Sequence, residues 1–366
     1  MADLLYVTAD MGGNVQPMLG VAAATAALGH RVRVIGHEQL REEITAAGLD
    51  FVPYTTVRQW DSTKTQIPIA WVPMLNDSAM ADDVRTECER RRPDVAIVDC
   101  LLFPAQDAVA KLGIPRVVLT HTIREYVDRT RKVRYFGASV PANLYGYRPA
   151  RLWDSADLNL VTTLRDLDPA RDRPQPANLE WTGPVLPPAV DAVPQNPPHV
   201  LVSLSTNGFP GQRGTLKRII QALAHLPVQA TVTTASVFDP ETFDAPDTVT
   251  VTGYADHSAL LARSSLLIGH GGHSTTFRAL SHGIPVLVLP ASSFLDQRMI
   301  GVSLRDAGVG NVLRRSASSS TIAEATQELL SDNGLAGRVR ELGARIRATD
   351  GASQAASRID DLIQKA

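Results

Sequence analysis

The chain has 366 residues, with 36 Lys or Arg and 38 Asp or Glu, so its formal net charge at neutral pH is −2. This length exceeds one ordinary core and predicts two domains, on a prior of about 150 residues per domain. A near-neutral chain without a basic face is not expected to bind nucleic acid. No apolar run approaches the ~20 residues that span a bilayer, so we expect no membrane partner either.

The first apolar stretch, Leu4 to Val7, is short and lacks a basic segment before it, so it predicts a strand and not a secretory signal. The two cysteines, Cys88 and Cys100, are therefore expected to be reduced structural thiols in a cytoplasmic protein. The sequence leaves the oligomeric state open, with a homodimer as one alternative.

Short apolar segments alternate with helical patterns along most of the chain, which is typical of α/β domains with parallel sheets. In the first half, strands are predicted at 4–9, 31–36, 95–99 and 116–120. A helix is predicted from Pro17 to Leu28 between the first two strands, because Gly29 follows as a stop signal.

A proline-rich stretch from about residue 166 to 199 interrupts this alternation. Proline fixes φ and removes a hydrogen-bond donor, so the stretch is not expected to form a helix or a central strand. We therefore assign 1–175 to a first domain and 176–198 to a linker.

The second half resumes the alternation, and we assign 199–348 to a second domain and 349–366 to a closing amphipathic helix. Strands are predicted at 200–205, 229–235, 249–253, 265–269 and 285–290. Doubly wound sheets present their loops at the carboxyl ends of their strands. We therefore expect the functional site in a cleft that both domains share.

The segment from Ile268 to Gln297 carries the strongest functional signal in the chain. A strand ends at the turn His270-Gly271-Gly272, and Ser274 and Thr275 then open a helix. A glycine turn that leads into a helix N-terminus exposes backbone N–H groups to an anion. Asp296 and Gln297 follow the next strand. The segment predicts a pocket for a phosphorylated ligand, with a polar pair to hold the group that the phosphate carries.

With these motifs the chain resembles the family 1 glycosyltransferases of GT-B fold, especially those that modify bacterial natural products. The resemblance is most specific over 252–310, weaker over 4–36, and elsewhere extends only to the order of elements. It implies two Rossmann-like domains facing across a cleft. It also implies a UDP- or dTDP-sugar donor as co-substrate, a small hydrophobic or aromatic acceptor, and neither a cofactor nor a metal.

The resemblance assigns the donor site residue by residue. Tyr254 matches an aromatic residue that stacks on the base, Ala255 the backbone that reads the base edge, and His257 a residue near the ribose. Asp296 and Gln297 match the pair that hydrogen-bonds the sugar hydroxyls. The residues that match the phosphate contacts are Ser205, Thr206, His270, Gly271, Gly272, Ser274 and Thr275.

The first departure from the family concerns the general base. Aligned on Pro17, Asn14 occupies the position of the family's basic histidine, although Asp99 matches the carboxylate that supports it. An amide is no base near neutral pH. Three explanations stay open: an intrinsically nucleophilic acceptor, another base (Asp10, Asp99 itself or His121), or a chain that does not catalyse. Asn14 can still orient an acceptor, beside Gly13.

The second departure is Arg278, which stands where family members have a glutamate that binds the ribose hydroxyls. A guanidinium cannot accept hydrogen bonds from a diol. This substitution favours a dTDP-deoxysugar donor, because the nucleotide then lacks the 2′-hydroxyl. The alternative is that Arg278 faces solvent or approaches a phosphate.

The acceptor pocket is expected from the variable segments 54–80 and 123–153, which hold many of the aromatic residues, since clustered aromatics suit a flat or hydrophobic ligand. These residues are Trp60, Trp71, Tyr126, Tyr135, Phe136, Tyr145, Tyr147 and Trp153. Basic residues also outnumber acidic ones between Arg124 and Arg151, which indicates a solvated basic face or an acidic acceptor.

Together these features predict a metal-independent, inverting glycosyltransferase that acts on a small natural product. Two alternatives remain: another GT-B enzyme, such as a nucleotide-sugar epimerase or a lipid-linked glycosyltransferase, and a non-catalytic homologue that assists a partner enzyme.

Overall fold

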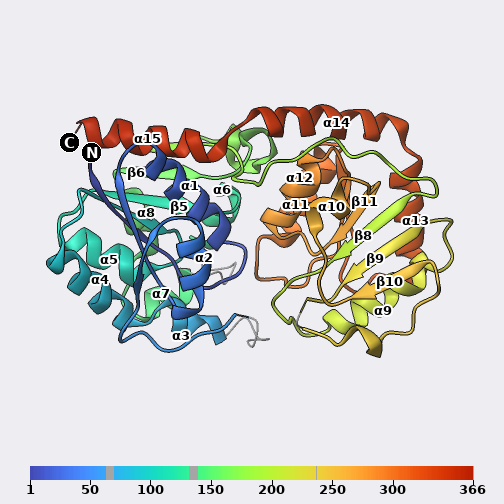
Figure 1. Ribbon diagram of the computed structural model, residues 1–366, viewed down its shortest axis with the longest axis horizontal. Helices are drawn as coiled ribbons and strands as arrows, with labels where there is room; N and C mark the ends of the chain where they lie inside the picture. Colours follow the sequence, from blue (N-terminus) through green and yellow to red (C-terminus); the bar gives the residue numbers. More distant parts are fainter. Residues whose placement is uncertain (63–69, 132–138, 236, 366) are drawn as a thin grey trace. The chain divides into compact units, whose positions relative to one another are not determined.

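The structure, a computed structural model, describes residues 1–62, 70–131, 139–235 and 237–365. The chain divides into two compact units, each built on its own sheet (Figure 1). Unit 1 contains Met1–Ser62, the described residues from Ala70 to Leu186, and the C-terminal stretch from Asp350; unit 2 contains Pro187–Thr349.

Unit 1 is built on a seven-stranded parallel sheet with the order β3-β2-β1-β4-β5-β6-β7. Its strands are β1 (Asp3–Val7), β2 (Arg31–Gly36), β3 (Asp50–Pro53), β4 (Val95–Asp99), β5 (Arg116–Thr120), β6 (Leu158–Val161) and β7 (Leu179–Trp181). The strand order reverses between β1 and β4. Ligands of open α/β sheets bind at such a reversal, beyond the carboxyl ends of the strands.

Alternate residues of β1 supply two apolar cores, one on each face of this sheet. Leu4 and Tyr6 pack with Met18 and Ile359, whereas Leu5 packs on the opposite face in a cluster that includes helix α4. The helices of unit 1 are α1 (Val15–Ala27), η1 (Glu38–Leu40), α2 (Arg41–Ala46), α3 (Trp71–Leu75), α4 (Ser78–Arg90), α5 (Phe103–Lys111), α6 (Arg124–Thr130), α7 (Ser139–Leu144), α8 (Pro149–Asp154), η4 (Arg165–Leu167), η5 (Pro169–Asp172) and α15 (Gly351–Lys365).

The C-terminal helix α15 belongs to unit 1, where it packs on α1. Figure 1 shows α15 in red beside the blue N-terminal helix. The buried face of α15 carries Ala355, Ala356 and Ile359, all at 1% exposure or less. Its apolar positions, spaced at helical intervals in the sequence, therefore cover the first core of the unit.

Unit 2 is built on a six-stranded parallel sheet with the order β10-β9-β8-β11-β12-β13. Its elements are β8 (His199–Ser203), α9 (Gln212–Leu223), β9 (Gln229–Thr233), η6 (Pro240–Thr242), β10 (Val249–Thr252), α10 (His257–Leu261), β11 (Leu266–Gly269), α11 (His273–Ser281), β12 (Val286–Val288), α12 (Gln297–Asp306), β13 (Gly310–Val312), α13 (Ser319–Ser331) and α14 (Asn333–Ala348). Here the strand order reverses between β8 and β11.

The predicted doubly wound architecture is confirmed, and every predicted strand is present with small shifts of its ends. Four further strands, β3, β6, β7 and β13, have only three or four residues each, too few to form a periodic pattern. The chain passes from unit 1 to unit 2 between Leu186 and Pro187, inside 176–198. The proline-rich stretch does contain one strand, β7, but this strand lies at the edge of the sheet, where an unpaired N–H is tolerated.

None of the helices in the described ranges is both long enough and apolar enough to cross a membrane.

Candidate functional site

The candidate acceptor site of unit 1 lies at the reversal of its strand order. Asn14 follows β1, Asp99 ends β4 and His121 follows β5, and these three parallel strands are neighbours. Because their carboxyl ends meet at one edge of the sheet, the fold brings three of the predicted residues together. Asn14 and Asp99 are buried, whereas 17% of the His121 side chain is exposed.

Asn14 is held rigidly by its own neighbours. Its amide Nδ2 donates to the Asp99 carboxylate at 3.1 Å, to the Ala9 carbonyl at 3.0 Å and to the Thr8 hydroxyl at 3.3 Å. Its Oδ1 accepts the Met11 N–H at 3.2 Å. Both ends of the amide are occupied, so Asn14 orders the turn between β1 and α1 and supports Asp99.

His121 pairs with the same carboxylate from the other side. Its Nδ1 lies 3.1 Å from Asp99 Oδ2. Burial opposes the charged imidazolium, but the negative charge of Asp99 and hydrogen bonds to Asp99 and Cys100 outweigh it, so the pKa of His121 is raised well above its usual range. The carboxylate thus supports a histidine, although this histidine comes from β5 and not from the turn after β1.

Cys100 also belongs to this cluster, although its sequence position predicted only a structural thiol. It is 1% exposed, and burial together with the Asp99 charge raises its pKa, against opposing hydrogen bonds from His121 and Thr120. One ligand atom of each of Asp99, Cys100 and His121 lies within 4.8 Å of the other two, and no other group of three or more His, Cys, Asp or Glu side chains in the described ranges is gathered closely enough to hold a metal. The position of Cys100 directly after Asp99 was the only sign in the sequence that it could join this cluster.

Asp10, the other candidate base, is engaged with a neighbouring loop. Its carboxylate accepts the Ser62 N–H at 3.1 Å and the Ser62 hydroxyl at 2.8 Å, and its carbonyl accepts the Trp60 indole N–H at 2.9 Å. Its own N–H donates to His37 at 3.2 Å. Asp10 therefore has a structural task, and His121 is the candidate base with an ionised partner.

The predicted acceptor residues differ in how much surface they offer. Gly13 is exposed, and the half-buried Trp60 and Trp71 pack edge to face with ring centres 6.2 Å apart. Tyr126 is 7% exposed and Trp153 only 1%. The expectation that Trp153 contributes to the acceptor pocket is wrong, because it is buried on α8, packs on Phe103 and donates to the Cys100 carbonyl. Tyr135 and Phe136 lie outside the described residues.

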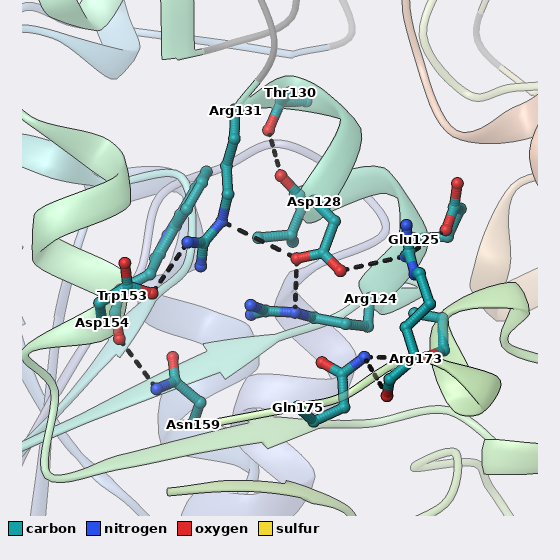
Figure 2. Close-up of polar contacts among 12 residues, drawn as sticks. Arg124, Glu125, Asp128, Thr130, Arg131, Trp153, Asp154, Asn159, Arg173 and Gln175 are labelled. Carbon is teal, nitrogen blue, oxygen red and sulfur yellow. Dashed lines mark hydrogen bonds and ion pairs between the residues drawn. The ribbon is translucent and has the colours of Figure 1, made fainter. Parts of the chain in front are cut away.

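The basic segment after His121 is largely neutralised by its own carboxylates (Figure 2). Arg124 pairs with Asp128 at 2.9 Å, and Arg131 pairs with Asp154 at 2.8 Å. Arg173 reaches both Asp128 and Glu125. This network anchors α6. These arginines are therefore paired with carboxylates inside unit 1 and do not form a free basic face. Lys132 and Arg134 lie outside the described residues.

Asp168 fixes the start of α6. This helix begins at Arg124, three residues after His121. It is fully buried, and its carboxylate accepts the N–H groups of Arg124 at 2.6 Å, Glu125 at 3.1 Å and Ala170 at 3.0 Å, and the Trp181 indole N–H at 2.9 Å. A carboxylate at a helix N-terminus also complements the helix dipole. Asp168 belongs to the Asp-x-Asp sequence 166–168, and its oxygens are committed to these donors.

In unit 2 the turn His270-Gly271-Gly272 links β11 to α11. Gly271 has a φ of +84°, and a Cβ there would lie 2.6 Å from the Gln297 carbonyl oxygen and 2.7 Å from Val288 Cγ1. A Cβ on Gly272 would collide with the His270 ring. Both glycines are therefore required sterically, and the turn lies directly against the start of α12.

The residues that we predicted as phosphate donors, in the turn and in the loop after β8, follow the carboxyl ends of two neighbouring strands. Gly272 is the N-cap of α11, so Ser274 and Thr275 lie in its first turn, where N–H groups have no intrahelical partner. Burial lowers the pKa of His270 to about 4, so its ring is neutral at pH 7. Ser205 and the exposed Thr206 follow β8, the neighbour of β11.

The Asp296-Gln297 pair begins α12. Asp296 is the N-cap and is half-buried, whereas Gln297 is 2% exposed. The Gln297 Oε1 accepts the N–H groups of Ala291 at 2.7 Å and Ser292 at 2.9 Å. The pair was expected to offer hydrogen-bond donors and acceptors together. Because the Gln297 oxygen is already used, Gln297 has only its amide NH₂ to offer a ligand.

Three of the residues predicted to contact the nucleoside, Tyr254, Ala255 and His257, follow the carboxyl end of β10. Tyr254 is 88% exposed, a large aromatic surface in water, and Ala255 beside it is half-buried. Burial and the nearby Arg278 charge lower the pKa of His257, whose ring contacts the Thr233 hydroxyl at 3.4 Å. Arg278 is half-buried and donates to the Ser258 hydroxyl, so it links α11 to α10 and does not extend freely into solvent.

Two hollows of about 650 and 340 Å³ lie elsewhere in unit 1, beside α5, α7 and α8. Arg116, the first residue of β5, lines the larger one, whereas His121 follows the last residue of that strand. The two hollows are therefore separate from the cluster of Asp99, Cys100 and His121 at the carboxyl ends of the strands.

Several known glycosyltransferases are similar to this chain. The family profile described as "Erythromycin biosynthesis protein CIII-like, C-terminal domain" matches residues 217–360. Over 194 residues, the chain is 33% identical to a PGL/p-HBAD biosynthesis rhamnosyltransferase of Mycobacterium bovis, a match to 51% of this chain and 41% of that protein. The match thus spans about two fifths of the mycobacterial relative.

Other similarities extend over the whole chain. The NDP-glycosyltransferase YjiC of Bacillus subtilis is 23% identical over 380 residues, which cover 96% of this chain and 95% of that protein. The crystal structure of the glycosyltransferase of kitacinnamycin superposes with a TM-score of 0.83 at 24% identity, covering 99% of both chains. The glycosyltransferase VinC in complex with dTDP gives 0.73 at 16% identity, covering 99% of this chain and 100% of its own. These structural likenesses confirm the GT-B fold.

Proposed function

We propose that this chain, a homologue of the family 1 glycosyltransferases of GT-B fold, transfers a sugar from a nucleoside diphosphate sugar to a small hydrophobic or aromatic acceptor. An acceptor oxygen attacks the anomeric carbon as the diphosphate leaves, with inversion and without a metal. The observation that carries the proposal is the contact of the His270-Gly271-Gly272 turn with the start of α12 at Gln297.

The donor half of the reaction uses the turn and the N-terminus of α11. The leaving diphosphate gains negative charge as the bond breaks, and preorganised N–H groups with the helix dipole stabilise that charge. His270 Nδ1 is buried and has no hydrogen-bond partner in the described part of the chain. Asp296 and the Gln297 amide then hold the sugar, and Tyr254 stacks on the base.

The acceptor half uses His121 as the general base. Asn14 is excluded from this role because an amide has no useful basicity and both of its ends are occupied. The Asp99 carboxylate, 3.1 Å from His121 Nδ1, stabilises the imidazolium that forms when the acceptor hydroxyl loses its proton. Such a base contributes about 10²–10⁴-fold to the rate.

The nucleotide is a dTDP-deoxysugar. Arg278 donates to Ser258 beside His257, so a cation, and not a carboxylate, stands near the expected ribose. A guanidinium offers no acceptor to a 2′-hydroxyl. Calorimetric titrations with dTDP and UDP test this point, and clearly tighter UDP binding would contradict it.

Turnover is tested by incubating the protein with mixed nucleotide sugars in the presence of a chelator, and following donor hydrolysis and transfer to phenolic and polyketide acceptors. We expect slow hydrolysis alone and faster release of nucleotide with an acceptor. The anomeric configuration of the product, measured by the proton coupling constant, tests inversion.

The second candidate is a non-catalytic homologue that binds nucleotide and assists a partner enzyme. The replacement of the usual basic histidine by Asn14 favours it. Nucleotide binding without turnover on any acceptor would support this candidate, whereas loss of transfer in His121→Ala with unchanged nucleotide affinity would support catalysis.

A further inference from the structure

The cluster at the ends of β4 and β5 has a chemistry that the transfer reaction does not use. A carboxylate, a thiol and an imidazole converge there, and sugar transfer needs only the first and the last. We propose that Asp99, Cys100 and His121 form a binding site for a zinc ion, which blocks the base when it is occupied.

The distances fit a tetrahedral ion after a small adjustment. Two ligand atoms held at about 2.0–2.1 Å from a tetrahedral centre lie roughly 3.3 Å apart. Asp99 Oδ2 and His121 Nδ1 are 3.1 Å apart. The three ligand atoms lie within 4.8 Å of one another, so they need only close around an ion.

The charges also balance. A thiolate and a carboxylate together carry two negative charges, which neutralise a divalent ion in a buried position, where an uncompensated charge is costly. Asp99 and Cys100 are exposed by 1% or less. On binding, the proton of the Cys100 thiol and any proton on His121 Nδ1 are released to the buffer, and the ion takes their place.

Binding of the ion has a consequence for the base. Three protein ligands leave one position of a tetrahedral zinc ion for water. The Nδ1 of His121 is then coordinated, and the Asp99 oxygen that stabilises the imidazolium is coordinated as well. The ion therefore acts as a reversible inhibitor of acceptor activation. This consequence rests on the proposed function, whereas the binding itself does not.

Cobalt(II) reports directly on the sulfur ligand, because a cobalt–thiolate bond gives a charge-transfer band in the near ultraviolet. The chain has only two cysteines, so Cys88→Ser is a matched control for Cys100→Ser. Both thiols are buried, but Cys88 is not part of the cluster. We expect one cobalt ion per chain, with the band retained in Cys88→Ser, absent in Cys100→Ser, and displaced by zinc.

Several results would overturn the proposal: no band, a band that survives in Cys100→Ser, or a band that disappears only in Cys88→Ser. His121→Ala, in which the neighbouring thiol remains, provides a second variant and is expected to weaken binding at least tenfold. Far-ultraviolet circular dichroism shows whether each variant is folded, and unchanged cobalt affinity in folded His121→Ala would also refute the site.

Inhibition forms the second arm. Stoichiometric zinc is expected to abolish transfer by the wild type and by Cys88→Ser, with recovery on chelation, and to leave the rate of Cys100→Ser at its own zinc-free value. If zinc displaces the cobalt band but does not inhibit transfer, the ion does not block the base. That result would also argue against His121 as the general base. A chain without any transfer activity contradicts the proposed function, and the cobalt experiment still decides the site.

Discussion

Replacing Gly271 by alanine tests the packing on which the donor site depends. The left-handed φ of +84° costs a side-chain-bearing residue about 1–2 kcal/mol. The new Cβ would also lie 2.6 Å from the Gln297 carbonyl oxygen and 2.7 Å from Val288 Cγ1, and such overpacking costs about 1–3 kcal/mol. The sum predicts that the free energy of unfolding of unit 2 falls by roughly 2–5 kcal/mol.

Gly211→Ala in the same unit is the matched control. Its φ is +81°, but the nearest atom to a new Cβ, Arg315 Cζ, is 4.0 Å away. Only the backbone cost of about 1–2 kcal/mol is expected there. The difference between the two variants therefore measures the close contacts of the turn with Gln297 of α12 and Val288 of β12.

Urea unfolding followed by two signals measures this difference. The chain has four tryptophans, all in unit 1, so their fluorescence reports on that unit, while far-ultraviolet circular dichroism reports on both. In Gly271→Ala the unfolding transition seen by tryptophan fluorescence is expected to stay at the same urea concentration, while the transition seen by circular dichroism moves to lower urea. The affinity for dTDP is also expected to fall. If Gly271→Ala is no more destabilised than Gly211→Ala, the turn does not lie against α12 and the reasoning fails.

Three further predictions concern charge, stacking and capping. Asp99→Asn removes the charge that raises the pKa of His121. The transfer rate rises with pH as the imidazole loses its proton, so this rise should move to lower pH in the variant. A pH–rate profile in which the rise stays at the same pH would exclude His121 as the base. Tyr254→Ala should weaken dTDP binding by about 1–3 kcal/mol in calorimetry, with Tyr254→Phe near wild type, and equal losses in both would argue against stacking. Asp168→Ala removes four hydrogen bonds and should destabilise unit 1 by about 3 kcal/mol, a larger loss than the exposed N-cap variant Asp332→Ala causes in unit 2. Tryptophan fluorescence follows the first variant and far-ultraviolet circular dichroism the second, and a loss no larger than that of Asp332→Ala would be contrary to a capping role.

Most of the fold could be predicted from local pattern. Buried parallel strands such as VAIVD at 95–99 are continuous apolar runs, because both faces of the sheet are covered by helices. The missed strands β7 and β13 have three residues each and include polar or glycine positions, so their pairing is decided by the neighbouring strand and not by their own composition.

The candidate site was predicted in part. Gly271 and the Asp296-Gln297 pair were identified as one functional segment, and the structure adds that the turn touches the Gln297 backbone. Tyr126 and Trp153 were counted as acceptor aromatics because they occur in a variable region, yet both are buried. Composition shows that a region is rich in rings, but not which of them are covered.

The sequence by itself determined the two doubly wound sheets, the glycine turn at 270–272 that we predict to hold a phosphate, and the absence of a basic histidine at Asn14. These features depend on residues close together in the chain. Only the tertiary structure decided that Asp99 pairs with His121, that Asn14 supports the same carboxylate, and that Cys100 joins them. The physical reason is that neighbouring parallel strands bring together residues separated by up to about a hundred positions, at distances and angles that no local pattern encodes.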